Sequence, residues 1–203
     1  FCIASRVSIT SMVVGLTGKY CAGKNEAARV FAERGFRVVD VDRLGHQALE
    51  ASRDEIAARF GPGVMDPHGG VDRKKLGKLV FGDRKKLRDL EDIVHPLMVE
   101  RVKDLVSDDS VPHLINAALL FPMGLDALCR RILIVRAPLC RRIRRALARD
   151  RLGLPGTLRR IWIQRKLIPQ SSLLPADIVT VENSGAREKF REKVSLVISR
   201  LTG

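Results

Sequence analysis

The sequence is poor in aromatic residues, in acidic residues and in long hydrophobic runs. Aromatic side chains make up 4% of the 203 residues, so the core must be built from aliphatic side chains. No segment approaches the roughly 18–20 consecutive apolar residues that a membrane-spanning helix needs. Hydrophobic residues make up 45% and charged residues 30% of the chain, as in ordinary globular proteins. These values argue against a membrane-spanning or disordered chain, and the length suits a single domain.

Cysteine is also scarce, and its spacing matches neither a metal site nor a disulfide framework. The sequence contains Cys2, Cys21, Cys129 and Cys140. They form no Cys-x-x-Cys pair and have no histidine cluster nearby, which argues against a zinc site or a disulfide framework and favours a reducing, cytoplasmic setting. The apolar residues 1–16 run directly into a glycine-rich loop without a convincing cleavage site, so we interpret their end as a buried strand rather than a signal peptide. Met12 is a candidate initiator, which would make residues 1–11 an upstream extension.

The basic charge is concentrated in one window. Lys and Arg number 37 against 23 Asp and Glu, a net charge of +14. Residues 130–166 hold thirteen Lys or Arg and one acid, Asp150, which is 13 − 1 = +12. This density favours an anionic partner: nucleic acid, an acidic membrane or a phosphate-rich small molecule. A solvated helix face is the alternative. Trp162 is the one aromatic residue of the window, so stacking on single-stranded nucleic acid is less favoured.

Strand and helix signals alternate along the chain. Apolar runs predict strands at residues 12–16, 36–41, 113–121, 131–135 and 177–181. Amphipathic patterns predict helices at residues 25–34, 54–60, 73–80, 84–107, 139–151, 157–167 and 186–201. Pro96 is expected to break the fourth of these helices or to start a new one. Strands separated by helices predict an α/β fold with a mostly parallel sheet covered on both faces.

The clearest motif is a glycine-rich loop at residues 18–25, Gly-Lys-Tyr-Cys-Ala-Gly-Lys-Asn. It fits the phosphate-loop pattern G-x-x-x-x-G-K between a predicted strand and a predicted helix. Backbone N–H groups and the helix N-terminus would cradle phosphate oxygens, and Lys24 would reach the β- and γ-phosphates. Asn25 stands where a hydroxyl usually binds Mg²⁺, so its amide oxygen is a weak candidate ligand, directly or through water. A dinucleotide-binding fold is not supported, because no G-x-G-x-x-G is present.

Two aspartates, Asp40 and Asp42, are expected to close the second strand. Open α/β sheets bind ligands at that edge, and alternation would place both carboxylates on one face with Val41 on the other. One carboxylate near a triphosphate can accept the proton of an attacking hydroxyl or hold metal-bound water. The alternative is that either aspartate caps a helix.

Two further signals are weaker. The helix predicted at 139–151 carries Arg141, Arg142, Arg144, Arg145 and Arg149. Arg145 and Arg149 are four residues apart and share a face, from which a lid could stabilise the charge of a transferring phosphoryl group. RNA binding or a solvent-exposed face are the alternatives. His95, followed by Pro96, is by itself better explained by a structural role than by a functional one, because a lone histidine is more often structural than catalytic.

Taken together, these segments resemble the dephospho-coenzyme A kinase family. The resemblance covers residues 12–185. It rests on residues 15–18, 32–36, 39–42, 70–76, 80–81, 93–96, 137–138, 145, 149–150, 164, 176–177 and 183–185. It implies one P-loop kinase domain with a three-layer core at about 12–44, 112–137 and 174–203. It also implies a helical substrate-binding subdomain at about 45–111 and a basic lid at about 138–173.

The resemblance implies transfer of the γ-phosphate of ATP, with Mg²⁺, to the ribose 3′-hydroxyl of dephospho-coenzyme A, the last step of coenzyme A synthesis. The implied partner is this small molecule, with no membrane and with nucleic acid not favoured, for a monomer or small homo-oligomer. Two alternatives stay open. One is another P-loop nucleotide or nucleoside kinase, and the other is a P-loop protein that has lost catalysis and binds RNA through its basic window.

The resemblance also implies roles for individual residues. Catalysis is assigned to Asp42 as the base, Lys24 and Arg145. ATP binding is assigned to Gly18, Lys19, Tyr20, Cys21, Ala22, Gly23, Lys24, Asn25, Glu26, Arg149 and Asn183. Substrate binding is assigned to Asp42, Arg73, His95 and Pro96.

The sequence departs from the family pattern at three places. Asn25 replaces the hydroxyl residue, and Lys19 and Cys21 stand where the family usually has glycine. Residues 116–122 contain none of the carboxylates that the family usually has there, and Pro122 stands in the place of a glutamate. The expected consequence is an active kinase with a modified metal shell.

Overall fold

A computed structural model describes residues 12–149, 153–163 and 177–202 of the chain. Its contacts divide the chain into two compact units. The first consists of the residues up to Asp40 and from Leu105 onward, and it contains the β-sheet. The second, Val41–Asp104, is helical. Part of the predicted lid at 138–173 lies outside the described residues. The motif residues Asp150, Gln164 and Ala176 lie outside them entirely.

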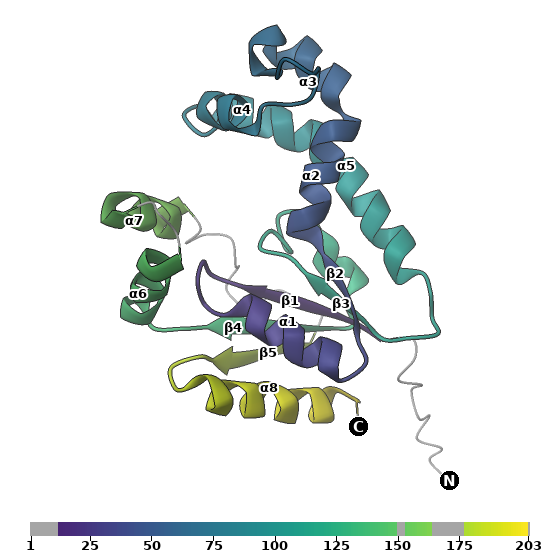
Figure 1. The fold of residues 1–203 in the computed structure, drawn as a ribbon. Helices are drawn as coiled ribbons and strands as arrows, with labels where there is room; N and C mark the ends of the chain where they lie inside the picture. The colour runs from purple at the N-terminus through teal and green to yellow at the C-terminus, as the bar shows by residue number, and fades with distance from the viewer. Residues whose placement is uncertain (1–11, 150–152, 164–176, 203) are drawn as a thin grey trace. The chain divides into compact units, whose positions relative to one another are not determined.

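The first unit is built on a five-stranded parallel sheet with the strand order β2-β3-β1-β4-β5 (Figure 1). The strands are β1 (Val13–Gly18), β2 (Arg37–Asp40), β3 (His113–Asn116), β4 (Arg131–Arg136) and β5 (Asp177–Glu182). In the ladders, Leu16 pairs with Asn116, and Asp40 pairs with the same residue on its other side. The carboxyl ends of the strands therefore meet at one edge of the sheet, where open α/β sheets bind their ligands. The predicted parallel α/β architecture is confirmed.

Helices α1 (Lys24–Glu33) and α8 (Arg187–Thr202) lie side by side on one face of this sheet (Figure 1). Their core side chains, including Phe31 and Phe190, are buried against strand residues such as Leu16. The same unit holds α6 (Leu139–Arg149), α7 (Gly153–Ile163) and the short η3 (Leu125–Leu128). Arg-rich α6 begins three residues after β4 ends, so it starts from the carboxyl edge of the sheet.

The opposite face of β1 is covered by the segment between β3 and β4. A Cβ atom added at Gly15 would lie 2.8 Å from Cys129 Sγ and 2.9 Å from Leu120 Cδ2. Leu120 and Leu125 of the same segment have no exposed surface. Glycine at position 15 therefore allows this segment to pack directly on the central strand.

The helical unit contains α2 (Val41–Ala51), α3 (Arg53–Phe60), η2 (Pro62–Val64), α4 (Arg73–Val80) and most of α5 (Arg84–Val106). Ile56, Leu76 and Val102 are fully buried or nearly so. The Asp72 carboxylate caps α4 by accepting hydrogen bonds from the backbone N–H groups of Lys74 (3.0 Å) and Lys75 (3.1 Å). Within the described part of the chain, no helix combines the length and apolar character needed to cross a membrane.

Two sequence-based predictions of elements are wrong, and one helix was missed. The third strand ends at Asn116 rather than at residue 121, because the chain turns after Ala117 to cover the sheet face. The long helix α5 runs through Pro96 without a break. Helix α2 was not predicted, because Gly45 interrupts its helical pattern. In the structure this glycine lies against Met98, whose Cε would be 3.4 Å from an added Cβ.

Candidate active site

The predicted strand–loop–helix arrangement around the phosphate loop is confirmed. Strand β1 ends at Gly18, and α1 begins at Lys24. The backbone angle φ is positive at Cys21 (56°) and Gly23 (110°) but not at Ala22 between them. Alternation of this kind turns successive backbone N–H groups toward one concave side, the geometry that binds anions. The first-turn N–H groups of α1 open at the end of the same loop.

Gly18 and Gly23 are required by the space around them. A Cβ atom at Gly18 would lie 2.7 Å from the carbonyl oxygen of Val135 on the neighbouring strand. At Gly23 it would lie 2.2 Å from Nδ2 of Asn183, and the left-handed backbone there is itself unfavourable for other residues. Both ends of the loop are therefore held in close contact with the sheet unit.

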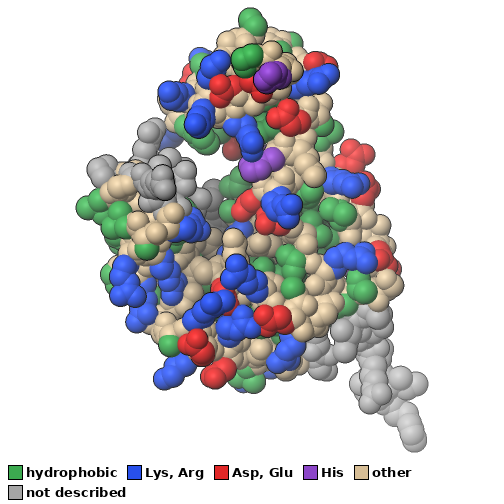
Figure 2. Space-filling model, viewed as in Figure 1, with side chains coloured by type: hydrophobic (Ala, Val, Ile, Leu, Met, Phe, Trp, Pro, Cys, Tyr) green, Lys and Arg blue, Asp and Glu red, His purple; other side chains and the backbone are tan. Residues whose placement is uncertain are grey.

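Three arginines of α6 contact the loop from a single helix face. Nε of Arg142 donates to the carbonyl oxygen of Tyr20 at 2.8 Å. Nη1 of Arg145 donates to the carbonyl oxygen of Ala22 at 3.2 Å. The guanidinium of Arg149 lies 5.4 Å from the centre of the Tyr20 ring, a cation–π distance. Figure 2 shows Lys and Arg side chains gathered over α6. The shared face predicted for Arg145 and Arg149 is thus present, and Arg142 belongs to the same row.

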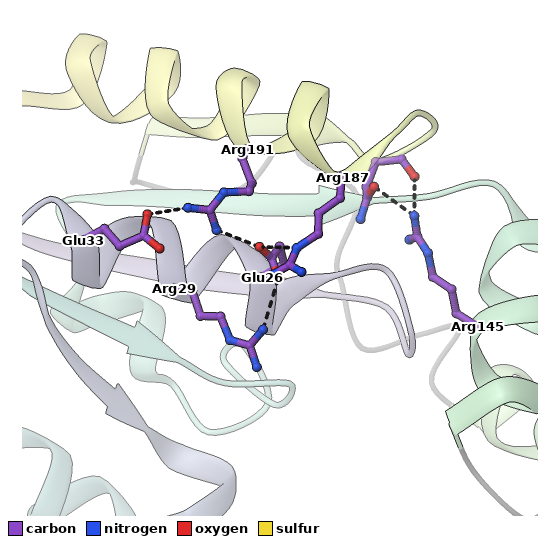
Figure 3. A network of polar contacts seen from close by, with 7 residues as sticks. Glu26, Arg29, Glu33, Arg145, Arg187 and Arg191 are labelled. Carbon is purple, nitrogen blue, oxygen red and sulfur yellow. Dashed lines mark hydrogen bonds and ion pairs between the residues drawn. The ribbon is translucent and has the colours of Figure 1, made fainter.

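Asn183 closes the site from the carboxyl end of β5. Its side chain is buried, and its Nδ2 donates to the carbonyl oxygen of Ala22 at 2.9 Å. Its Oδ1 accepts a hydrogen bond of 2.9 Å from Nη2 of Arg145, which is labelled in Figure 3. In this structure the amide of Asn183 thus binds the loop, and its assignment to ATP binding stays a prediction.

Glu26, a predicted ATP-binding residue, ties α1 to α8 through its side chain (Figure 3). Its carboxylate accepts hydrogen bonds from Arg191 (2.7 Å), Arg187 (3.0 Å) and Arg29 (3.3 Å), and only 16% of the side chain is exposed. Burial alone would raise the pKa of this carboxyl, but the hydrogen bonds from Arg191 and Arg187 lower it below 4.5. Glu33 binds the other end of the Arg191 guanidinium. The Glu26 side chain therefore fixes the helix that follows the loop.

Two charged or polar residues begin helix α1. Lys24 is its first residue and is half-buried, and Asn25 is exposed beside it. Lys19 is exposed at the start of the loop. Lys24 and Asn25 lie at the positive end of a helix, where anionic ligands are favoured.

A metal ion at this site would rely on few protein ligands. Among the described residues, no group of three or more His, Cys, Asp or Glu side chains could hold a metal ion. At the carboxyl edge of the sheet, however, Asn116 is buried, and its Oδ1 has no hydrogen-bond partner within the described part of the chain. Mg²⁺ commonly keeps several waters and binds substrate phosphates with one or two protein ligands. The buried amide oxygen of Asn116 is therefore a candidate ligand that sequence reasoning missed.

The predicted geometry of the two aspartates is wrong. Asp40 ends β2, but α2 begins at the next residue, and Asp42 lies exposed in its first turn. A carboxylate in the first turn of a helix is favourable, and Asp42 occupies that position in α2. Asp40 and Asp42 therefore do not share a strand face. A helix does begin here, and whether either aspartate caps it stays a prediction.

The substrate-binding candidates belong to the helical unit. Arg73 is the first residue of α4 and is exposed. His95 is half-buried in α5, and Pro96 follows it exposed on the same helix. Burial lowers the pKa of His95, although Glu91 and Asp92 partly oppose that effect. Burial therefore favours the neutral form of this imidazole.

Similarity to known proteins decides the family. A profile described as dephospho-CoA kinase matches residues 12–188. The chain belongs to the dephospho-CoA kinase family. The dephospho-CoA kinase of Fusobacterium nucleatum is 32% identical over 184 residues, which cover 89% of this chain and 94% of that protein.

Two solved structures are also similar to this chain. The crystal structure of TT1252 from Thermus thermophilus has a TM-score of 0.79 and 30% identity, and covers 95% of this chain and 98% of its own. A dephospho-CoA kinase from Campylobacter jejuni, at 21% identity and a TM-score of 0.65, covers 94% of this chain and 96% of its own and supports the fold alone.

Membership of the dephospho-CoA kinase family confirms the predicted enzyme class. The chain is a kinase, and therefore a transferase, of the final step of coenzyme A biosynthesis. It has a P-loop kinase fold. The two alternatives, another nucleotide or nucleoside kinase and a P-loop protein that has lost catalysis and binds RNA, are not favoured. The roles of individual residues are not settled by similarity and stay predictions.

Proposed function

We propose that this protein phosphorylates the ribose 3′-hydroxyl of dephospho-coenzyme A with ATP and releases ADP. The observation that carries the proposal is the phosphate loop, in which the backbone at Cys21 and Gly23 forms an anion-binding concavity at the start of α1. A reducing compartment, the cytoplasm, suits the thiols of Cys129 and Cys140. The protein acts as a monomer or small homo-oligomer.

The phosphate loop binds and orients the triphosphate. Backbone N–H groups of the loop and the positive end of α1 hold the phosphate oxygens, and Lys24 neutralises charge on the β- and γ-phosphates. Such fixed donors stabilise the charge that spreads over the transferring phosphoryl group. Arg145 and Arg149 hold the loop from its other side, and their predicted lid function would add to this stabilisation.

Asp42 is the proposed general base. The 3′-hydroxyl oxygen forms a bond to the γ-phosphorus while the bond from that phosphorus to the β,γ-bridging oxygen breaks. The hydroxyl proton passes to the Asp42 carboxylate. Arg73, His95 and Pro96 are the proposed contacts of the helical unit with the coenzyme A moiety.

Mg²⁺ is the proposed metal cofactor. Asn25 and Asn116 would hold it together with phosphate oxygens and water, and the ion would neutralise charge on the phosphates. Because both protein ligands are neutral amides, binding depends on the nucleotide more than on the protein.

The substrate is tested by measuring ADP release in a coupled assay with ATP, Mg²⁺ and dephospho-coenzyme A. Adenosine and a nucleoside monophosphate serve as control acceptors. Release with dephospho-coenzyme A alone is expected. If folded protein that binds ATP releases ADP with none of these acceptors, the proposed activity is wrong.

The role of Asp42 is tested by Asp42→Asn, which keeps the size of the side chain but removes the base. We expect kcat to fall by about 10²–10⁴-fold with nearly unchanged ATP binding. Asp54→Asn is the matched control, because Asp54 is an exposed aspartate in the first turn of α3. An unchanged kcat in Asp42→Asn would remove Asp42 from the mechanism.

A further inference from the structure

We infer that Arg142 is a positioning residue for ATP, because it holds the carbonyl side of the phosphate loop so that the N–H side faces the phosphates. This inference rests on the proposed function in one respect, that the phosphates of ATP are the ligand of the loop. It assigns a role to a residue that neither the motif nor the family resemblance singled out.

The loop needs support on its carbonyl side. In a peptide unit the N–H and C=O groups point in opposite directions, so a loop that turns N–H groups toward a ligand turns carbonyls away from it. These carbonyls need donors of their own when they are buried. Three consecutive ones, of Tyr20, Cys21 and Ala22, accept hydrogen bonds from side chains outside the loop. The donors are Arg142, Arg145 and Asn183.

Arg142 is the most buried of the α6 arginines that touch the loop. It is only 6% exposed, whereas Arg145 is half-buried and Arg149 is exposed. Its Nε donates to the carbonyl oxygen of Tyr20 at 2.8 Å. Its Nη2 is also buried and finds no acceptor among the residues that the structure describes.

Stability does not explain this arrangement. Removing a guanidinium from water is costly, and a buried donor without an acceptor adds to the cost. Burial accordingly lowers the pKa of Arg142. An apolar side chain of similar length would fill the same space without these two penalties, but it would leave the Tyr20 carbonyl without this donor. What the arginine supplies, and an apolar residue cannot, is the hydrogen bond that fixes the Tyr20 carbonyl.

The inference therefore predicts a larger effect on binding than on stability. In Arg142→Met, the melting temperature should change little, because the desolvation cost of the guanidinium disappears while the Tyr20 carbonyl loses its donor. The dissociation constant of a fluorescent ADP analogue should rise about tenfold. Arg142→Lys should recover part of that affinity, since Nζ can donate to one carbonyl. Arg144→Met is the matched control, because Arg144 is exposed on the same helix, and its affinity should equal that of the wild type.

Steady-state kinetics provide a second measurement. In Arg142→Met, the KM for ATP should rise by the same factor, and the KM for dephospho-coenzyme A should not change. An unchanged ADP affinity in folded Arg142→Met, or a fall in melting temperature without a change in affinity, would overturn the inference. The ADP measurement needs no turnover, so it decides the role of Arg142 even if dephospho-coenzyme A proves not to be the substrate.

Discussion

Position 23 has two requirements, and glycine is the residue type that meets both. Its φ of 110° is unfavourable for residues with a Cβ, and its Cα faces the side-chain amide of Asn183. That amide in turn binds the carbonyl of Ala22, one residue earlier in the loop. The conformation of the loop and the seating of Asn183 therefore depend on each other.

We expect Gly23→Ala to lower both stability and nucleotide affinity. The new Cβ would lie 2.2 Å from Asn183 Nδ2, so the amide must move away from the Ala22 carbonyl. The free energy of unfolding should fall by about 1–3 kcal/mol. Urea titration and ADP binding measure the two effects. Gly63→Ala is the control, since no atom lies within 4 Å of its added Cβ. Wild-type affinity in Gly23→Ala would contradict the expectation.

At the scale of elements, the helix that follows the loop is anchored by charge. The Glu26 carboxylate accepts hydrogen bonds from two arginines of α8, Arg187 and Arg191, in a largely buried position. Glu33, in the last turn of α1, also binds Arg191, but its side chain is 56% exposed. Ion pairs at exposed sites contribute little, so the buried end of this network carries most of its stabilisation.

Glu26→Gln should therefore lower the free energy of unfolding by about 1–2 kcal/mol at pH 7. The control Glu33→Gln should change it by less than about 0.5 kcal/mol. Because the pKa of Glu26 is lowered in the folded state, its contribution is fully present above pH 4.5 and is lost as the pH falls through the folded-state value. The stabilities of wild type and Glu26→Gln, measured by denaturation at several pH values, should converge in acid. A gap that does not change with pH would show that charge is not its cause.

Pro96 gives a second prediction for an element. It lies inside α5, where its ring nitrogen has no hydrogen to donate to the carbonyl four residues earlier. Because Pro96 is exposed, Pro96→Ala should raise the stability of the protein by about 1–3 kcal/mol in chemical denaturation. Glu100→Ala, one turn further on, is the control, with an expected change within about 0.5 kcal/mol. A rise in the KM for dephospho-coenzyme A in Pro96→Ala would support its predicted substrate contact, and a loss of stability would refute the helix argument.

At the scale of the whole molecule, the net charge of +14 predicts an effect of salt on ligand binding. The dissociation constant of ATP should rise several-fold between about 50 and 500 mM NaCl, because salt screens charges over shorter distances. Uncharged adenosine is the control ligand and should respond much less. Equal responses of ATP and adenosine would show that charge does not guide the nucleotide. We also expect that micromolar protein does not bind RNA at moderate salt.

Part of the site follows from local sequence alone. Residues 18–25 contain the glycines and the lysine of a phosphate loop, and the structure places them between β1 and α1 as predicted. The backbone at Asp42 was harder to predict from the sequence. One Val between two aspartates is equally compatible with a strand that continues and with a helix that begins after Asp40. The folded chain starts α2 at Val41, directly after β2, and places Asp42 in the first turn of that helix.

The sequence by itself determined the fold class, the phosphate loop and the family, because these depend on short-range periodicity and on motifs of contiguous residues. The tertiary structure alone decided which side chains support the loop. Arg142 and Asn183 come from positions 122 and 161 residues further along the chain than the carbonyls they bind. A hydrogen bond to a backbone carbonyl requires no particular partner side chain. Contacts over such separations therefore leave no pattern in the sequence and become visible only when the sheet brings its carboxyl ends together.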